Sequence, residues 1–262
     1  MTATPKPIPY AAWRNTPVAG HLEVWAEVHS PQLGNTRPIV VYLPPSYART
    51  VRKRYPVLYM HDGQNLFDAT TSFVGIEWGV DETMEQLSHE GIEAIVVGIW
   101  NTPQRMAEYC PFPQWFEGRG EAYLDFLVHT VKPLVDHTYR TRREREHTGI
   151  FGSSMGGLIS LYAFFTRPQV FGFVGAMSPA FWVGNGAIHA LVRARPCVPG
   201  RIYIDHGTEE YNPQRMREVL IEKGYRLGAT LRYVTERGGQ HHESAWARRL
   251  PEALRFLLRP TP

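Results

Sequence analysis

A serine at position 154 occupies the centre of a Gly-x-Ser-x-Gly pattern within residues 152–157. In this pattern the serine lies on a sharp turn between a strand and a helix, and its hydroxyl is exposed above a sheet. Residues 148–151 are typical of a strand and residues 158–163 of a helix. The context therefore favours nucleophilic attack by Ser154. The alternatives are a glycine-rich connector with a capping serine and a phosphate loop, which fits poorly because no Gly-Lys-[Ser/Thr] follows.

A serine hydroxyl needs a base to remove its proton, and on an α/β-hydrolase sheet the partners follow in the order serine, acid, histidine. His189 is expected in a surface segment, and His206 ends a predicted strand. His241 and His242 lie between the last predicted strand and the final helix, where this fold places its base. The alternative for this pair is a solvated loop or a helix start with Glu243 in its first turn.

Three carboxylates follow the predicted strand at 201–205 and are candidates for the acid that orients the base: Asp205, Glu209 and Glu210. Asp205 still belongs to the strand pattern, whereas the two glutamates lie in the loop beyond it. Either carboxylate type can hold an imidazole tautomer and stabilise its cation, so the residue types leave all three open. We expect no metal and no cofactor, because adjacent histidines rarely ligate one ion and no further His/Cys cluster accompanies them.

Alternating strand and helix patterns must position these residues. Strands are expected at 21–29, 37–43, 55–60, 92–100, 148–151, 171–176, 201–205 and 230–234. Helices are expected at 78–88, 121–139 with a kink at Pro133, 155–165, 214–224 and 244–258. This alternation predicts an α/β fold with a mostly parallel sheet of about eight strands, covered by helices on both faces, with the first strands antiparallel at one edge. Residues 1–20 are expected to form an extended arm, and residues 21–262 a single catalytic domain.

Composition excludes several classes of protein. Of the 262 residues, 43% are hydrophobic and 20% are charged, a composition typical of a globular protein. The net charge of +3 is too weakly basic to indicate nucleic-acid binding. Two cysteines, Cys110 and Cys197, are too few for a disulfide scaffold. The first 15 residues lack the apolar region of a signal peptide, and no membrane-spanning run occurs. We therefore expect a cytoplasmic protein with no membrane or nucleic-acid partner; the oligomeric state stays open.

Several further stretches carry a resemblance to a known family. They are residues 57–68 with the motif H-D-G-Q-N, residues 97–99 with Asn101, Arg105, Glu108 and Tyr109, and residues 152–157, 178–182, 205–210 and 238–241. With them the chain resembles the putative esterase family of α/β-hydrolases, which includes enterochelin-type siderophore esterases, feruloyl and acetyl-xylan esterases, and mycolyltransferases. The resemblance extends from about residue 20 to the end, and it is specific for the family but not for a substrate.

The resemblance implies that Ser154 is the nucleophile and that His241, which follows Gly-Gly-x, is the base. The acid of the family is the fourth residue of a G-T-x-[DE] segment, which is Glu210 in this chain. The chain departs from the pattern at His242 and in carrying glutamate where some relatives carry aspartate. An oxyanion hole requires two backbone N–H groups. One is expected from Met155, after the nucleophile, and the other from Gly63 or Gln64 in the loop after the third strand.

The substrate is predicted only in outline, as a small-molecule ester. Phe181 and Trp182 are candidates for the wall of the substrate site, with core packing as the alternative. Arg105 could meet an anionic substrate group or form an ion pair with Glu108. The absence of a sizeable insertion for a lid suggests an open cleft for short acyl groups or bulky alcohols. The leading hypothesis is a serine ester hydrolase; the alternatives are an acyltransferase, a hydrolase specific for siderophore esters, and a non-catalytic binding protein.

Overall fold

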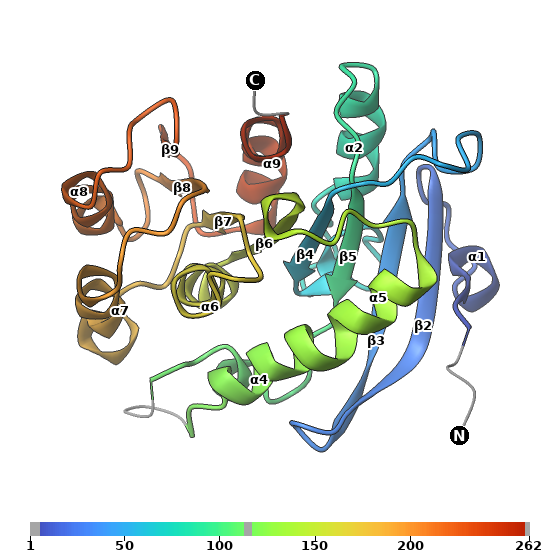
Figure 1. The fold of residues 1–262 in the computed structure, drawn as a ribbon, viewed down its shortest axis with the longest axis horizontal. Coiled ribbons are helices and arrows are strands. Elements are labelled where there is room, and N and C mark those ends of the chain that lie inside the picture. The colour runs from blue at the N-terminus through green and yellow to red at the C-terminus, as the bar shows by residue number, and fades with distance from the viewer. Residues whose placement is uncertain (1–5, 113–116, 260–262) are drawn as a thin grey trace.

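The computed structural model describes residues 6–112 and 117–259, and in this part of the chain nine strands form one sheet (Figure 1). The strands follow the order β1-β2-β3-β5-β4-β6-β7-β8-β9. Pairs from β1 to β5 are antiparallel, and pairs from β5 through β4 to β9 are parallel. Their bounds are Ile8–Pro9, His21–Ser30, Asn35–Leu43, Val57–His61, Ile95–Ile99, Thr148–Ser153, Phe173–Met177, Arg201–Gly207 and Leu231–Glu236 for β1 to β9. The predicted fold, mostly parallel with antiparallel strands at one edge, is confirmed.

Helices cover both faces of the sheet, which explains why β4, β5 and β7 are buried along their whole length. One core cluster joins the sheet to α4 (Gly120–Phe126), α5 (Lys132–Thr138), α6 (Met155–Thr166), α7 (Val183–Ala194) and α8 (Gln214–Glu222). The other joins it to α1 (Tyr10–Trp13), α2 (Val80–Ser88) and α9 (Glu243–Leu258). Figure 1 shows α2 and α9 next to each other on this second face. A short helix α3 (Arg105–Glu108) follows β5.

The expected kink at Pro133 takes another form. Between α4 and α5 the chain forms a π-helical turn, η2, at Leu127–Val131. The N–H of Lys132 donates to the carbonyl of Leu127, five residues back. Because Pro133 has no N–H, the ladder of hydrogen bonds must change near it, and an extra residue in the turn before it meets this requirement.

The amino-terminal arm is more firmly held than expected where the structure describes it. β1 pairs with β2, and Tyr10 is buried and donates a 3.0 Å hydrogen bond to Asp68. Residues 1–5 of the predicted arm lie outside the described residues. Over 6–112 and 117–259, no helix has both the length and the apolar character needed to cross a membrane.

Candidate active site

The predicted site residues all follow the carboxyl ends of parallel strands. Gly63 comes after β4, Ser154 after β6, Trp182 after β7, Glu210 after β8 and His241 after β9. Parallel strands present their carboxyl ends at one edge of the sheet, and ligand sites of open α/β sheets lie outside that edge. The topology therefore gathers residues separated by up to 178 positions in the sequence at one end of the molecule.

Ser154 lies on the turn between β6 and α6. Its backbone angles, φ 54° and ψ −119°, are unfavourable for a residue with a side chain, and strain of this kind is concentrated at functional sites. The turn is fixed by two hydrogen bonds: Ser154 N–H donates to the Met177 carbonyl at 2.9 Å, and Ala180 N–H donates to the Ser154 carbonyl at 3.0 Å. Glycine is required at 152 because a Cβ there would lie 2.8 Å from the carbonyl carbon of Gly156. Ser154 is thus held, half-buried, at the N-terminus of α6.

A carboxylate and an imidazole meet after β8 and β9. His241 Nδ1 lies 2.7 Å from Oε2 of Glu210. The Glu210 side chain is only 3% exposed, whereas that of His241 is 44% exposed. Of the other two acid candidates, Asp205 is buried against Tyr203 and Ser178, and Glu209 accepts a hydrogen bond from Gln240. Glu210 is therefore the only one of the three candidate carboxylates that contacts His241.

The other histidines have local structural partners. His242 is the N-cap of α9, and its Nδ1 accepts the N–H of Ser244 at 3.3 Å. His206 contacts the Gly207 carbonyl and the Thr235 hydroxyl. His189 was expected in a surface segment, and this expectation is wrong: it lies on α7, is 3% exposed and contacts the Gly186 carbonyl. The helical face of α7 turns it inward.

A helix and a short 3-10 turn begin where oxyanion donors are expected. Met155 is the first residue of α6, and Gly63 is the first residue of the 3-10 turn η1 (Gly63–Asn65). The first N–H groups of a helix have no acceptor within that helix, so they are available to a developing negative charge. Gly63 must be glycine because a Cβ would lie 2.5 Å from the carbonyl carbon of Gly98. Gln64 is held by its side-chain oxygen, which accepts the N–H of Asn101 at 3.2 Å.

No hydrogen bond joins the Ser154 hydroxyl to His241 among the described residues. Such contacts in unliganded hydrolases are often long and shorten only when substrate binds. Two contacts orient His241: its Nδ1 contacts Glu210, and its ring lies edge-on to the ring of Trp246 at 5.1 Å. The contact with Glu210 involves Nδ1 and not Nε2, the nitrogen that would act on Ser154.

Comparison with known proteins shows the family of the chain. The model of the family described as "Putative esterase" matches residues 30–257. The chain belongs to the putative esterase family. This esterase is 28% identical over 244 residues to the uncharacterized protein YbbA of Bacillus subtilis, an alignment that covers 86% of this chain and 93% of YbbA. It is 26% identical to the ferri-bacillibactin esterase BesA of the same organism, over 79% of this chain and 80% of BesA.

A solved structure supports the same fold. The ferric enterobactin esterase of Salmonella typhimurium superposes on the esterase with a TM-score of 0.73 at 20% identity. The superposition covers 98% of this chain and 62% of the Salmonella chain. The predicted α/β-hydrolase fold and the predicted family are therefore confirmed.

Behind the Glu210–His241 contact lies a network that the sequence analysis did not identify. The hydroxyl of Ser178 donates to Glu210 Oε1 at 2.7 Å. The Ser178 hydroxyl oxygen in turn accepts from Trp246 Nε1 at 2.8 Å and from Arg249 Nη2 at 2.7 Å. Arg249 also forms ion pairs with Asp205 at 3.1 Å and with Glu236 at 2.8 Å, and it lies 3.6 Å from Glu210. Ser178, directly after β7, therefore links the Glu210 carboxylate to Trp246 and Arg249 on α9.

Charge and burial set the ionisation of the two carboxylates in opposite directions. Although burial opposes ionisation, hydrogen bonds from His241, the Gly207 N–H and Ser178 lower the pKa of Glu210 below its usual range. Burial raises the pKa of Asp205 to about 7, against the opposing charge of Arg249. A lowered pKa keeps Glu210 ionised at neutral pH, which suits a group that must stabilise an imidazolium.

Arg105 has a different partner from either one expected. Its Nε and Nη2 bind the two carboxylate oxygens of Asp62 at 2.7 and 2.8 Å. Glu108, the alternative partner, instead binds Arg37 at 2.8 Å. The predicted Arg105–Glu108 pair is wrong because Glu108 is fully buried and directed at β3. Asp62 also accepts from Asn101, and it lies directly before the Gly63 turn, so Arg105 supports that turn.

The two predicted wall residues differ in exposure. Phe181 has no exposed surface and packs against the buried His189, so it belongs to the core, and the expectation that it lines the substrate site is wrong in this conformation. Trp182, at the start of α7, is 48% exposed. Phe73 is a further exposed aromatic residue, at 83%, and its N–H donates to Asn65 of η1 at 3.0 Å. Phe73 therefore lies on a loop that is attached directly to the proposed oxyanion turn.

One group of carboxylates has the spacing of metal ligands within the described part of the chain. Oxygen atoms of Glu77, Asp81 and Glu82 all lie within 4.8 Å of one another. Burial, reinforced by Glu82, raises the pKa of Asp81 to about 8, so this carboxyl is largely protonated at neutral pH. The group lies at the N-terminus of α2, where the helix dipole disfavours a cation. The triad geometry described above does not involve it.

Proposed function

We propose that the esterase hydrolyses carboxylic esters of small molecules through an acyl-enzyme at Ser154, with His241 as base and Glu210 as acid. One observation carries the proposal: the 2.7 Å contact between Glu210 and His241 occurs at the sheet edge that also carries a serine on a strained strand-to-helix turn. Together these residues supply a nucleophile, a base and the group that orients the base.

In the proposed reaction, Nε2 of His241 takes the proton of Ser154 as the hydroxyl oxygen attacks the ester carbonyl carbon. The carbonyl oxygen becomes an oxyanion, which the N–H groups of Met155 and of Gly63 or Gln64 stabilise; losing one such donor typically reduces the rate by about 10²–10³. The imidazolium then protonates the leaving alcohol, and an acyl-serine ester remains. Water, deprotonated by His241, attacks this ester and releases the acid and the free serine. Glu210 stays ionised throughout and stabilises the imidazolium.

The substrate is proposed to be an ester with an apolar or aromatic part. Trp182, the N-cap residue of α7, and Phe73, on the loop after η1, are exposed and offer flat apolar surface. Two of the proteins named above are, by name, a ferri-bacillibactin esterase and a ferric enterobactin esterase, and a further relative from Aspergillus fumigatus is named a siderophore triacetylfusarinine C esterase, which makes siderophore esters the first substrates to test. Feruloyl, acetyl-sugar and short-chain aryl esters complete the panel. Faster turnover of long-chain than of short-chain acyl esters would contradict the open-cleft hypothesis.

A fluorophosphonate probe tests the nucleophile. We expect it to label the protein once, at Ser154, and we expect Ser154→Ala to abolish both labelling and ester turnover. The neighbouring Ser153→Ala variant is the matched control, because Ser153 is buried in β6 and should not react. Turnover that persists in Ser154→Ala would refute the mechanism.

The acid is tested by two amide substitutions. Glu210→Gln should lower kcat by about 10³–10⁴, because an amide can favour the wrong imidazole tautomer. Asp205→Asn should lower kcat far less, because Asp205 contacts Tyr203, Ser178 and Arg249 but not His241. The reverse order of effects would move the role of acid to Asp205.

A further inference from the structure

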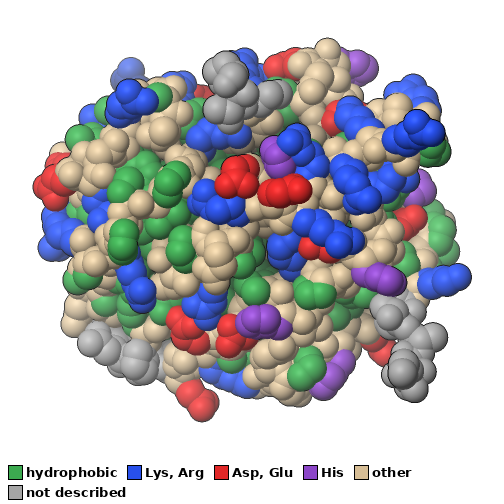
Figure 2. All heavy atoms as spheres, in the orientation of Figure 1, with side chains coloured by type: hydrophobic (Ala, Val, Ile, Leu, Met, Phe, Trp, Pro, Cys, Tyr) green, Lys and Arg blue, Asp and Glu red, His purple; other side chains and the backbone are tan. Residues whose placement is uncertain are grey.

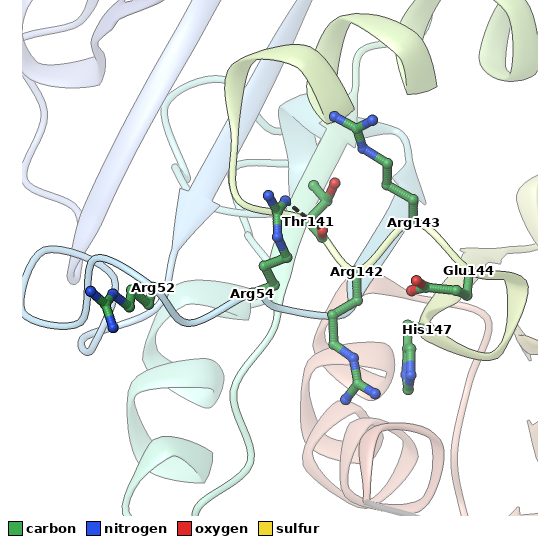
Figure 3. Close-up of a pocket in the computed structure, with 7 residues that line it drawn as sticks. All are labelled: Arg52, Arg54, Thr141, Arg142, Arg143, Glu144 and His147. Carbon is green, nitrogen blue, oxygen red and sulfur yellow. Dashed lines mark hydrogen bonds between the residues drawn. The ribbon is translucent and has the colours of Figure 1, made fainter.

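A hollow of about 620 Å³ lies far from the proposed catalytic site (Figure 3). Its lining residues include Arg54, shortly before β4, and His147, immediately before β6. Ser154 follows the other end of β6, and a strand of six residues spans about 20 Å. The hollow therefore lies at the amino ends of the parallel strands, opposite to the edge that carries the triad.

Two arginine-rich segments that are distant in sequence meet at this hollow. Tyr55 N–H donates to the Arg140 carbonyl at 2.9 Å, and Arg142 N–H donates to the Tyr55 carbonyl at 2.7 Å. This pair of backbone hydrogen bonds fixes the segment that contains Arg52 and Arg54 beside the segment that contains Arg142 and Arg143. The cluster is thus set by the backbone and is not a chance meeting of long side chains.

The four arginines of the hollow have no carboxylate partner among the described residues. Arg54 and Arg143 donate only to backbone carbonyls, and the guanidinium groups of Arg52 and Arg142 donate to nothing in the described chain. Cationic neighbours differ in this respect: Lys53 is paired with Glu93, and Arg140 stacks on Tyr47 at 3.7 Å.

The hollow therefore carries uncompensated positive charge. Four arginines line it with a single acidic residue, Glu144, so the lining has a net charge of +3, as large as that of the whole chain. Figure 2 shows Lys and Arg side chains gathered on the right-hand side of the view, where α5 ends in Figure 1. Like charges on one surface repel each other, and a bound anion would reduce that repulsion.

Three of the four arginines form two groups, and Arg52 lies apart from both in Figure 3. In Figure 3, Arg54 and Arg143 extend on either side of Thr141, whereas Arg142 extends the other way, alongside His147. A second hollow of about 360 Å³ shares Arg54, Arg142 and His147; it adds the cations Lys53, Arg201 and Arg259 and the carboxylates Glu93 and Glu146. A single small anion would reach only one of these groups. We propose that this surface binds a compound with two or more phosphate groups, because guanidinium groups bind phosphate oxygens in pairs of parallel hydrogen bonds.

Calorimetric titration of the 262-residue protein with inorganic tripolyphosphate at low ionic strength tests the proposal. We expect tripolyphosphate to bind and its affinity to fall as salt is added. Arg142→Glu and Arg54→Glu should each lower this affinity by about tenfold to hundredfold. Arg226→Glu is the matched control, because it makes the same change in net charge at an exposed arginine far along the sequence, before β9. Absence of binding, or equal weakening by Arg142→Glu and Arg226→Glu, would overturn the proposal.

Two sources of phosphate are separated by a second measurement. Sedimentation with vesicles of phosphatidylcholine mixed with phosphatidic acid reports on lipid headgroups, and tripolyphosphate reports on soluble ligands. Loss of vesicle binding in Arg142→Glu but not in Arg226→Glu would assign the site to lipid headgroups; tripolyphosphate binding alone would assign it to soluble compounds. The result is independent of the proposed catalysis, because Ser154→Ala should bind the phosphate probe normally and Arg142→Glu should hydrolyse esters normally.

Discussion

Replacing Ser178 by alanine tests whether the carboxylate of Glu210 must be held from behind. Ser178 is 3% exposed, so it cannot contact substrate. Its hydroxyl donates to Glu210 and accepts from both Trp246 and Arg249, all at 2.7–2.8 Å. The alanine variant removes these three hydrogen bonds at once and leaves the buried N–H of Trp246 without an acceptor.

The size of the effect follows from these contacts. A hydrogen bond to a charged group contributes about 1.5–3 kcal/mol, and an unpaired buried donor costs about 1–3 kcal/mol. Because the three bonds share one oxygen, they are not additive, and we expect the free energy of unfolding to fall by about 2–4 kcal/mol. Glu210 keeps the Gly207 N–H at 2.5 Å and its contact with His241, so kcat should fall about tenfold, which corresponds to about 1.4 kcal/mol.

The assay is steady-state hydrolysis of a short aryl ester, with kcat and KM measured separately. We expect kcat to fall while KM stays within about twofold, because the lost interaction acts on the imidazolium that forms in the transition state. Ser178 has φ 41°, which alanine tolerates poorly, so Ser178→Gly is the companion variant: it relieves the backbone strain and also lacks the hydroxyl. Ser160→Ala controls for the loss of a buried serine, since the Ser160 hydroxyl binds the Gly156 carbonyl. Wild-type kcat in Ser178→Gly would refute the role of the hydroxyl.

The remaining predictions concern stability, substrate binding and capping. The pKa of Asp81 is raised from 3.8 to about 8, so between these pH values the folded state holds a proton that the unfolded state releases, and the free energy of unfolding falls as the pH rises. In urea unfolding, Asp81→Asn should make the fall in this free energy between pH 5 and pH 8 smaller by at least about 1 kcal/mol. Arg105→Met leaves Asp62 buried without a cation and should lower the free energy of unfolding by about 3–5 kcal/mol; a loss below about 1 kcal/mol would contradict the pairing. Phe73→Ala should raise KM for aryl esters severalfold with kcat unchanged, and an unchanged KM would remove Phe73 from the substrate site. His242→Ser keeps an N-cap acceptor and should retain activity, whereas a loss of activity like that of a His241 variant would make His242 the base.

Much of the fold could be predicted because its elements have regular apolar patterns. The buried strands β4 and β5 are continuous apolar runs, and α9 shows a clear apolar face. α7 was not predicted, because Gly184, Asn185 and Gly186, which follow its first residue, all have positive φ, and such residues are typical of turns. The π-helical turn before Pro133 could not be distinguished from a kink, because both satisfy the missing N–H of proline.

Adjacent histidines show why the candidate site could be predicted only in part. His241 and His242 belong to the same loop and the same motif, and residue types alone could not separate them. The difference arises from the backbone: His242 takes extended angles, φ −153° and ψ 150°, and caps α9, while the preceding residue meets Glu210 across the loop after β8. The two imidazoles are chemically identical, but a helix cap and a base must point in different directions. Which histidine does which therefore depends on the residue at which α9 begins.

The network around Ser178 lies further beyond sequence patterns. Its contacts join residues separated by 32, 68 and 71 positions, so no local spacing reveals them. One signal was present: Arg249 lies on the apolar face of α9, three residues after Trp246 and one before Leu250, and all three are buried. An arginine is rarely buried unless it is paired, so its position on that face implies buried carboxylates on the strands beneath. Asp205 on β8 and Glu236 on β9 are those carboxylates, and Glu210, in the loop just after β8, lies 3.6 Å from the same guanidinium and contacts His241. A charged residue on the apolar face of the last helix thus indicates where the acid lies, even though it does not indicate which acid it is.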